Sequence, residues 1–286
     1  MNENIMAGKI CLITGANSGI GKAMTVQLAK YGATIIMVCR NSEKGELARQ
    51  EITEKSGNKN IHLVIIDLSM QQSIREGVSK IKQRFNKIDV LINNAGTLIF
   101  KKILTEDNIE TMFAVNYLAP FLLTRLLQDL LVHADNSRII NVVSEGTKES
   151  KIDLENLQSE KKFNPVLAYS QSKQAEIFFT YELAERLKMT KIKVNCFYPG
   201  LVQTNLGKAE KGFSKFTHAL MSKLLKNKFV PIEKSVEIGI FLAISPKAEK
   251  LNGKYLKREN DKIIINSGKD SQIRKELWEI SENLIQ

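Results

Sequence analysis

A tyrosine and a lysine four residues apart, Tyr169 and Lys173, carry the strongest chemical signal in this chain. On a helix, side chains four residues apart lie on one face and interact. A free phenol has a pKa of about 10, and an adjacent ammonium favours its phenolate. Lowering the pKa of a phenol to the neutral range is a shift of roughly three units, which requires about 4 kcal/mol of interaction energy in favour of the phenolate. We therefore expect a cationic cofactor ring to contribute. Taken alone the pair is weak evidence, because Tyr and Lys at this spacing usually form a solvated helix face.

A glycine-rich turn between an expected strand and an expected helix predicts a site for such a cofactor. Residues 14–21 read Thr-Gly-Ala-Asn-Ser-Gly-Ile-Gly. The glycines permit a tight turn and let a pyrophosphate approach the backbone, while the helix N-terminus offers free N–H groups and a partial positive charge. The position near the N-terminus, after a strand, favours a dinucleotide site over an empty turn. The predicted contacts are Gly15, Asn17, Ser18, Gly19, Ile20 and Gly21.

The end of the second expected strand predicts which dinucleotide binds. An acidic residue there would hold a ribose 2′-hydroxyl and select NAD, but the strand ends Val38-Cys-Arg40-Asn41. The guanidinium of Arg40 suits a 2′-phosphate, and Asn41 lies beside it. We therefore expect NADP, with a solvated strand-end charge as the other reading of Arg40.

Polar residues after the third and fourth expected strands have two readings each. Asp67, followed by Leu68, can accept a hydrogen bond from an adenine amino group or cap a helix that begins near Ser69. The run Asn93–Gly96 ends the fourth strand at the carboxyl edge, where ligands bind in such sheets. We expect one of its two amides to tie neighbouring strands together and Asn94 to contact the cofactor.

Apolar runs alternate with amphipathic stretches along the chain, as in βαβ units. Each run is apolar almost throughout, which is typical of parallel strands covered on both faces. This predicts an α/β fold, a single doubly wound Rossmann domain over residues 1–286 with a mainly parallel sheet and helices on both faces. The expected strands are Lys9–Thr14, Thr34–Cys39, His62–Asp67, Asp89–Asn93, Arg138–Ser144 and Lys193–Tyr198, and two of the expected helices are Lys22–Tyr31 and Ser73–Phe85.

Composition excludes several other classes of protein. The 286 residues carry a net charge of +11, with three single cysteines and three scattered histidines, and neither type has metal-ligand spacing. No nucleic-acid-binding signature accompanies the positive charge, so we expect no nucleic-acid partner. The N-terminus lacks the apolar core of a signal peptide, and no apolar run is long enough to span a membrane. We expect a cytoplasmic protein without a metal.

Taken together, these motifs closely resemble the short-chain dehydrogenase/reductase superfamily. The resemblance covers about the first 205 residues in the family's order, and it is strongest to the retinol dehydrogenase and carbonyl reductase group. The residues that carry it are Thr14–Gly21, Asn93–Gly96, Tyr169-x-x-x-Lys173, Pro199-Gly200 with Thr204, and the group-specific runs Val38–Gly45, Arg138–Ser144, Asp153–Leu157, Leu167–Lys173 and Leu277–Ser281.

The resemblance implies a catalytic tetrad of Asn116, Ser144, Tyr169 and Lys173. Ser144 and Tyr169 would bind a carbonyl oxygen, with Tyr169 as general acid. Lys173 would favour the phenolate and bind the nicotinamide ribose, and Asn116 would hold a water linked to Lys173. The segment Pro199–Thr204, with Pro199, Gly200 and Val202, would place backbone groups against the carboxamide, and Thr204 would place its hydroxyl near the phosphates. Ser144 precedes Tyr169 by 25 residues, a longer separation than in many members, so the extra segment, roughly 145–164, would overhang the site.

The substrate side is less predictable. In this family the segment 205–232 is the substrate lid, and within it residues 208–228 hold six lysines, one glutamate and an apolar stripe at helical spacing. Three roles are open for this stripe: it packs on the domain, it forms a pocket for a lipophilic substrate, or it contacts anionic lipid. Relatives that act on retinoids often have an N-terminal anchor, which we do not find here, so retinol is less favoured. Residues 271–286 are expected to dock as a helix or to contact a second subunit.

These observations predict an NADP(H)-dependent oxidoreductase that interconverts a small-molecule carbonyl, expected to be lipophilic, and its alcohol. The alternative is a dinucleotide-binding sensor that kept the fold and lost turnover. A complete tetrad argues against the sensor, because binding alone does not require Ser144, Tyr169 and Lys173 together.

Overall fold

The computed structural model describes residues 4–145, 152–202, 229–259, 262–267 and 271–285. Eight strands form one sheet in the order β3-β2-β1-β4-β5-β6-β7-β8. All neighbours are parallel except β7 and β8, which pair antiparallel. This confirms the predicted α/β class and the doubly wound, mainly parallel sheet. The strands are β1 Ile10–Thr14, β2 Thr34–Cys39, β3 Ile61–Ile65, β4 Val90–Asn93, β5 Arg138–Val142, β6 Lys193–Tyr198, β7 Lys254–Glu259 and β8 Lys262–Ser267.

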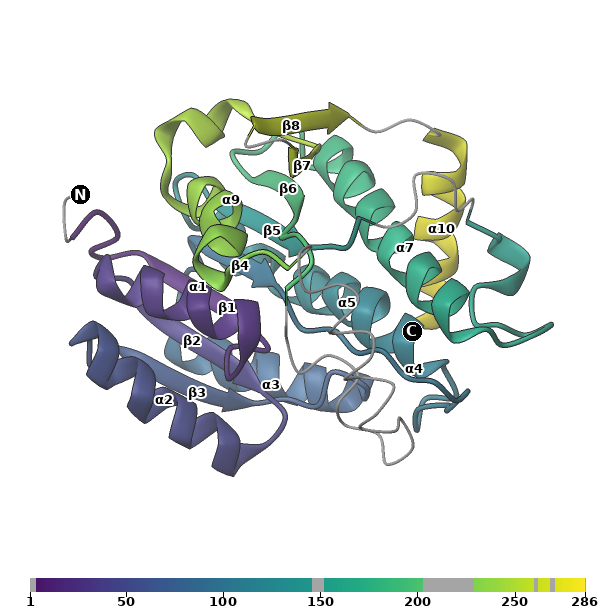
Figure 1. Ribbon diagram of the computed structural model, residues 1–286, viewed down its shortest axis with the longest axis horizontal. Coiled ribbons are helices and arrows are strands. Elements are labelled where there is room, and N and C mark those ends of the chain that lie inside the picture. The colour runs from purple at the N-terminus through teal and green to yellow at the C-terminus, as the bar shows by residue number, and fades with distance from the viewer. Residues whose placement is uncertain (1–3, 146–151, 203–228, 260–261, 268–270, 286) are drawn as a thin grey trace.

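Helices cover both faces of the sheet (Figure 1). Helices α1, α2 and α9 pack over one face, and α3, α5, α7 and α10 pack over the other. Buried apolar side chains fill both interfaces, as expected for strands that alternate between two covered faces. The helical elements are α1 Gly19–Lys30, α2 Ser42–Ser56, α3 Gln71–Arg84, α4 Thr111–Phe113, η1 Ala114–Leu118, α5 Ala119–Leu126, α6 Gln128–Val132, η2 Leu154–Asn156, α7 Pro165–Arg186, α9 Ile232–Ile244, η4 Pro246–Lys250 and α10 Ser271–Leu284.

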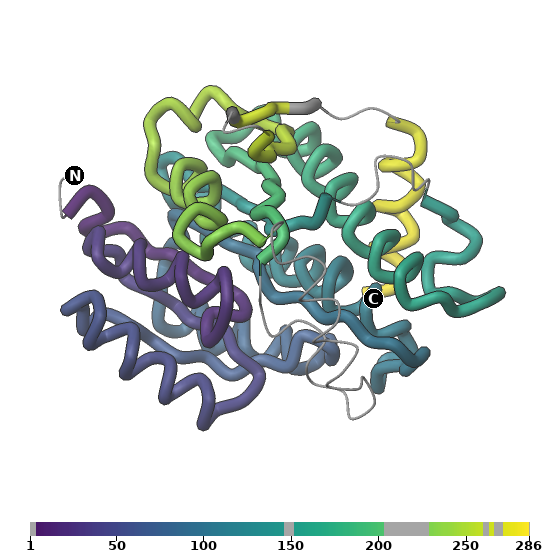
Figure 2. The backbone as a smooth tube through the Cα atoms, viewed as in Figure 1, coloured from purple at the N-terminus to yellow at the C-terminus, as the bar shows by residue number. Residues whose placement is uncertain are grey.

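The chain crosses the sheet from its middle to one edge and then to the other. Figure 2 follows this path, from the purple and blue N-terminal strands to the green and yellow C-terminal elements. The strand order reverses between β1 and β4, which places the ends of these two strands beside each other. Ligands of open α/β sheets bind in the crevice at this point, outside the carboxyl ends of the strands.

Helix α7, the longest described helix, is fixed at its start and along its outer side. The Asn164 side chain caps it by accepting hydrogen bonds from the next two free backbone N–H groups, and Pro165 begins it. On the outer side α10 packs against it: Trp278 stacks with Phe179, and the Arg186 guanidinium lies 4.3 Å from the indole centroid. This rigid support matters because α7 carries both Tyr169 and Lys173.

Helix α10 falls within the range 271–286 in which we expected a C-terminal helix, and it docks on the domain. Most of the expected lid lies outside the described residues, which resume at residue 229. Among the residues that the structure describes, no helix is both long and apolar enough to cross a membrane.

Candidate functional site

Ser144 and Tyr169 meet at the carboxyl end of β5. Ser144 lies two residues beyond the end of this strand, and its Oγ is 2.7 Å from the Tyr169 hydroxyl, a hydrogen-bond distance. Both side chains are half-buried. Two hydroxyls in this position can both donate to one oxygen atom of a small molecule, which is the geometry needed to stabilise charge that develops on a carbonyl oxygen.

Lys173 follows Tyr169 by four residues on α7 and is almost completely buried. Its Nζ donates to the Val142 carbonyl oxygen at 3.1 Å and to the Glu176 Oε2 at 2.8 Å. Burial lowers the pKa of Lys173, but the negative charge of Glu176, together with Tyr169, more than offsets it, and the pKa lies above its usual value. An ammonium therefore persists in a site from which water is largely excluded.

Asn116 lies in the π-helical turn η1, a distortion that is frequent at functional sites. Its Oδ1 accepts from the Thr97 backbone N–H at 2.7 Å, and its Nδ2 donates to the Thr97 carbonyl oxygen and to Ser172 Oγ. Ser172 Oγ donates in turn to the Tyr169 carbonyl oxygen. Asn116 thus joins the segment that follows β4 to α7. That it holds a water molecule stays a prediction.

All four residues of the predicted tetrad therefore lie in one region. A Cβ built on Gly96 would come 3.4 Å from Asn116 Oδ1 and 3.5 Å from Lys173 Nζ, so the backbone at Gly96 forms a wall beside both side chains. Tyr169 and Lys173 also interact electrostatically. The structure brings together the residues that the sequence separates by up to 57 positions.

The glycine turn forms a tight cradle before α1. Gly15 and Gly19 have positive φ angles of 64° and 53°, which glycine adopts without a steric penalty. A Cβ on Gly21 would lie 2.3 Å from Asn94 Nδ2 and 2.5 Å from the Gly15 carbonyl oxygen, so any side chain there would force the turn to shift. Ser18, at the N-cap of α1, makes no capping hydrogen bond, and the first turn holds no acidic residue. The N–H groups of this turn can therefore bind a phosphate.

Asn93 and Asn94 both serve the scaffold. Asn93 Nδ2 donates to Asn141 Oδ1 on β5 at 2.8 Å, and Asn94 Nδ2 donates to the Thr14 carbonyl oxygen on β1 at the same distance. Thr14 Oγ1 accepts from the backbone N–H groups of Asn94 and Ala95. We expected one amide to tie strands together, and the structure uses both. Contact of Asn94 with a cofactor stays a prediction.

Asp67 forms a tight turn, and our reading of it as a helix cap is wrong. Its Oδ1 accepts from both the backbone N–H and the hydroxyl of Ser69, whereas α3 begins at Gln71 with Met70 in the N-cap position. A side chain that bonds two residues ahead closes an Asx turn instead of capping a helix. The adenine contact predicted for Asp67 and Leu68 is not affected by this correction.

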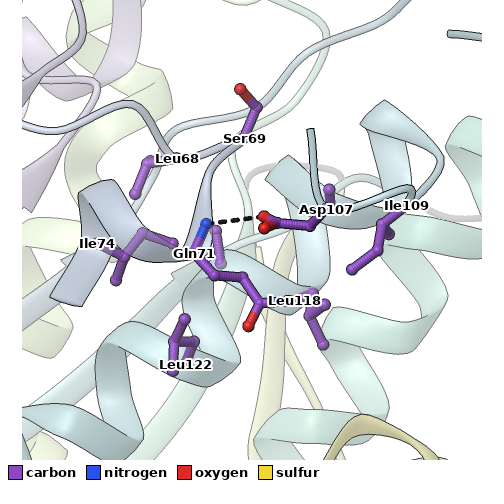
Figure 3. A pocket seen from close by; sticks show the side chains of 10 residues that line it. Leu68, Ser69, Gln71, Ile74, Asp107, Ile109, Leu118 and Leu122 are labelled. Carbon is purple, nitrogen blue, oxygen red and sulfur yellow. Dashed lines mark hydrogen bonds between the residues drawn. The ribbon is translucent and has the colours of Figure 1, made fainter. Parts of the chain in front are cut away.

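A small pocket beside Asp67 has apolar walls and room for about one water molecule. Figure 3 shows Leu68, Ile74, Ile109, Leu118 and Leu122 around it, with the Gln71 N–H donating to Asp107 at its rim. The pocket is too small for adenine, and neither Ser144 nor Tyr169 lines it. It is a packing gap between α3 and α5, separate from the tetrad.

Arg40 and Asn41 lie at the carboxyl end of β2, next to the glycine turn. Arg40 is exposed and makes no hydrogen bond or ion pair with the described residues. Asn41 Oδ1 accepts from the Lys44 N–H and so caps α2. A guanidinium without a protein partner is available to a phosphate, while the Asn41 side chain is already engaged.

Pro199, Gly200 and Val202 follow β6 at the same edge of the sheet. Gly200 has φ 86°, and a Cβ there would lie 2.7 Å from Val230 Cγ2, so glycine is required for this close approach. Leu201 pairs with Phe229 in a short bridge. Thr204 lies outside the described residues, as do residues 146–151 of the segment expected to overhang the site.

Sequence reasoning missed Glu176, which interacts directly with Lys173. In the sequence it is one acidic residue among many on a helix. The signal that identifies it is its spacing: it is three residues beyond Lys173, on the same helix face, and therefore shares the burial of that lysine.

Comparisons with known proteins agree with this geometry. The family model for short chain dehydrogenase matches residues 9–213. Mouse retinol dehydrogenase 14 is 37% identical over 99% of this chain and 88% of its own length. An uncharacterised protein from Mycobacterium paratuberculosis has a structure with a TM-score of 0.76 at 27% identity, covering 98% of this chain and 94% of that one. The structure of L-sorbose reductase from Gluconobacter frateurii, complexed with NADPH and L-sorbose, has a TM-score of 0.72 at 24% identity, covering 91% and 97%.

The family model matches most of the chain, and a relative above 30% identity covers nearly all of it. Both findings agree with the fold and with the positions of the motif residues. The chain therefore belongs to the short-chain dehydrogenase family of oxidoreductases, within its retinol dehydrogenase-like group.

Proposed function

We propose that this protein is an NADP(H)-dependent enzyme that interconverts a lipophilic carbonyl compound and its alcohol. The observation that carries the proposal is the 2.7 Å contact between Ser144 Oγ and the Tyr169 hydroxyl, with the buried ammonium of Lys173 on the same helix as Tyr169. This is a proton donor, a second oxygen-binding hydroxyl and a cation in one place.

The reaction needs little from the protein beyond these groups. The glycine turn would hold the pyrophosphate of a dinucleotide, whose dihydronicotinamide ring would supply the hydride. As a C–H bond forms at the carbonyl carbon, the π electrons move onto the oxygen, and Ser144 and Tyr169 stabilise the resulting negative charge by hydrogen bonds. Tyr169 then gives its hydroxyl proton to this oxygen as general acid. In alcohol oxidation the same proton returns to the Tyr169 oxygen.

The choice of NADP(H) rests on Arg40. The exposed guanidinium at the end of β2 can bind a 2′-phosphate, and its chain neighbours, Cys39 and Asn41, are not acidic residues that would repel that phosphate. The similar L-sorbose reductase structure contains NADPH, which agrees with this choice.

Replacing Arg40 with alanine is expected to lower kcat/KM for NADPH by roughly 10- to 100-fold, the usual value of one hydrogen bond to a charged group. The value for NADH should change little, because NADH lacks the 2′-phosphate. Steady-state kinetics with both cofactors measures this. Arg49→Ala on α2, which removes an arginine already bonded to Glu46, is the control and should leave the ratio unchanged. A wild-type preference for NADH would refute the choice of cofactor.

The lipophilic substrate is supported by the surface beside Tyr169. Val166 and Leu167, on the first turn of α7, are each 64% exposed although they are large and apolar. Exposed apolar side chains this close to a reactive group can be covered by an apolar substrate. Retinol, after which the mouse relative is named, is an alcohol of this kind.

Extending an unbranched aldehyde by one methylene is therefore expected to raise kcat/KM by about fourfold, since each buried methylene contributes about 0.8 kcal/mol. The gain should stop where the chain outgrows the site. Rates across a series of aldehydes test this, with L-sorbose as a hydrophilic control. A rate independent of chain length would remove the lipophilic part of the proposal.

Activity itself is tested by NADPH oxidation over a panel of aldehydes, ketones and quinones. Saturable turnover with at least one compound is the expected result. Tight NADPH binding without turnover on the whole panel would favour a dinucleotide sensor.

A further inference from the structure

Glu176 is the most unusual residue in the core of this protein. Its side chain is fully buried, and its Oε2 accepts from Lys173 Nζ at 2.8 Å, where Lys173 itself is only 5% exposed. Its second oxygen, Oε1, is buried and has no hydrogen-bond partner in the described structure. A buried carboxylate with an unpaired oxygen costs free energy, which requires a physical reason for its presence.

Stability alone is a poor reason. Removing two charges from water costs several kcal/mol per ion, and replacing a buried ion pair with apolar residues of similar volume is often neutral or stabilising. The unpaired Oε1 weakens the case further, because a buried pair compensates for desolvation only when its remaining lone pairs are satisfied. The position of Glu176, next to the cation of the tetrad, gives a functional reason instead.

The charges around Glu176 are few and can be named. Among the described residues, Lys173 is the one charged group that acts on its carboxyl. The nearby thiol of Cys196 on β6 stays neutral, because burial raises its pKa. The elements packed against α7 add the phenols of Tyr117 and Tyr255, whose pKa values burial also raises. Helix α10 adds the Arg274 guanidinium, 5.9 Å from the ring centroid of Tyr181 on α7. Glu110, the cap of α4, carries a carboxyl whose pKa burial raises as well.

Lys173 and Glu176 thus form a buried pair whose charges depend on each other. Burial raises the pKa of Glu176 to about 7, against the opposing effect of Lys173. The carboxylate in turn raises the pKa of Lys173. As an anion, Glu176 also opposes the positive potential that Lys173 exerts on the phenol oxygen of Tyr169, seven residues earlier on the same helix.

We propose that Glu176 is a positioning residue of the hydride-transfer site. It holds the Lys173 ammonium against β5 and offsets part of the charge of that ammonium. As a result, Tyr169 stays protonated, and therefore competent as a proton donor, to higher pH. The inference rests on the proposed function. It predicts a site biased toward carbonyl reduction, because reduction requires the protonated phenol and oxidation requires the phenolate.

Glu176→Gln is the direct test, because the glutamine oxygen can still accept from Lys173 while the charge is gone. Glu176 lies seven helical residues after Tyr169, which corresponds to roughly 10 Å along the helix. At this distance and an effective dielectric constant of about 20, one unit charge shifts the proton equilibrium of the phenol by about one pH unit. The alkaline limb of the kcat profile for carbonyl reduction is therefore expected to move about one unit lower. KM for the carbonyl compound should stay within about twofold, since Glu176 is buried beneath the site and cannot touch the substrate.

Three further variants separate charge from structure. Glu176→Asp keeps the anion and should restore most of the wild-type limb, whereas Glu176→Met removes the charge at similar volume and should shift the limb as glutamine does. Glu182→Gln changes a second buried glutamate of α7, whose partner is Arg186, and should leave the profile in place. Thermal melts confirm that each variant is folded.

Phenolate absorbance gives a readout that does not require activity. Subtracting the pH titration of Tyr169→Phe from that of the wild type isolates the phenol of Tyr169. The same difference curve, measured in the Glu176→Gln background, should have its midpoint about one unit lower in pH. An unchanged limb and an unchanged phenolate titration, or a shift to higher pH, would overturn the inference. A wild-type protein without turnover would refute the proposed function, but the phenolate titration would still decide the role of Glu176.

Discussion

Replacing Tyr169 with phenylalanine is expected to lower kcat by about two to four orders of magnitude, the usual contribution of a positioned general acid. The change keeps the ring and removes the hydroxyl whose oxygen lies 2.7 Å from Ser144 Oγ. NADPH affinity should stay within a few-fold of the wild type, because the predicted phosphate contacts lie in the glycine turn. Stopped-flow turnover and a fluorescence titration of NADPH measure the two quantities separately.

Tyr181→Phe is the matched control for this variant. Tyr181 lies on the same helix, twelve residues further along, and burial raises the pKa of its phenol, so it cannot serve as a proton donor near neutrality. Its loss should leave kcat within about twofold. If Tyr169→Phe and Tyr181→Phe turned over equally fast, Tyr169 would not be the proton donor.

Replacing Gly21 with alanine is expected to have the second largest effect, on both stability and cofactor binding. The new methyl group would overlap the Gly15 carbonyl oxygen, which belongs to the backbone and cannot rotate away. It would also overlap Asn94 Nδ2, which donates to the Thr14 carbonyl oxygen at the end of β1. Overpacking of this kind typically costs about 1–3 kcal/mol. We expect the free energy of unfolding to fall by this amount and NADPH affinity to fall by at least about tenfold, since the turn must open to make room.

Gly57→Ala separates these two effects. Gly57 has φ 69°, and a Cβ there meets no atom within 4 Å, so alanine introduces backbone strain of roughly 1–2 kcal/mol and no clash. Urea unfolding should therefore show a loss for both variants, whereas the NADPH titration should change only for Gly21→Ala. Wild-type NADPH affinity in Gly21→Ala would show that the turn does not hold the cofactor.

The parallel core of the fold could be predicted from the sequence because its strands carry one clear pattern. A strand that is covered on both faces is apolar almost throughout. Two of the six expected strands match β2 and β6 at both ends, and the other four correspond to β1, β3, β4 and β5 with shifts of one or two residues. At two carboxyl ends the shift falls where the apolar run outlasts the strand: β3 ends at Ile65 although Ile66 is still buried, and β5 ends at Val142 although Val143 is buried. The shifts at the starts of β1, β3 and β4 are of one residue each.

Strands β7 and β8 were not expected. Composition explains this for β7 alone, because β8 holds three consecutive isoleucines, an apolar run like those of the inner strands. Lys254–Glu259 carries three basic residues and one acidic residue in six positions, which is unlike the runs that reveal the inner strands. It lies near the edge of the sheet, where one side of the strand can remain polar. Its place there depends on pairing with β6, a contact over more than 50 residues that no local pattern encodes.

The site could be predicted residue by residue only where a motif fixes the spacing. Tyr169, Lys173 and the glycine turn are local patterns, so the sequence is sufficient to find them. The environment of Asn116 is not local: its bonds to Thr97 and Ser172 arise when η1 packs between the segment after β4 and α7. The burial of Glu176 likewise follows from the packing of α7 on the sheet, which makes a residue with the appearance of a surface charge part of the core.

Transfer of deuterium from C4 of labelled NADPH to a carbonyl compound tests the central claim most directly. With a long-chain aldehyde that the wild type accepts, mass spectrometry of the alcohol should find one deuterium, on the carbon that carried the oxygen, and Tyr169→Phe should lower the rate of its appearance by about the same factor as kcat. Bound NADPH that delivers no label to any aldehyde, ketone or quinone would contradict the account and leave a protein that binds the dinucleotide without using it.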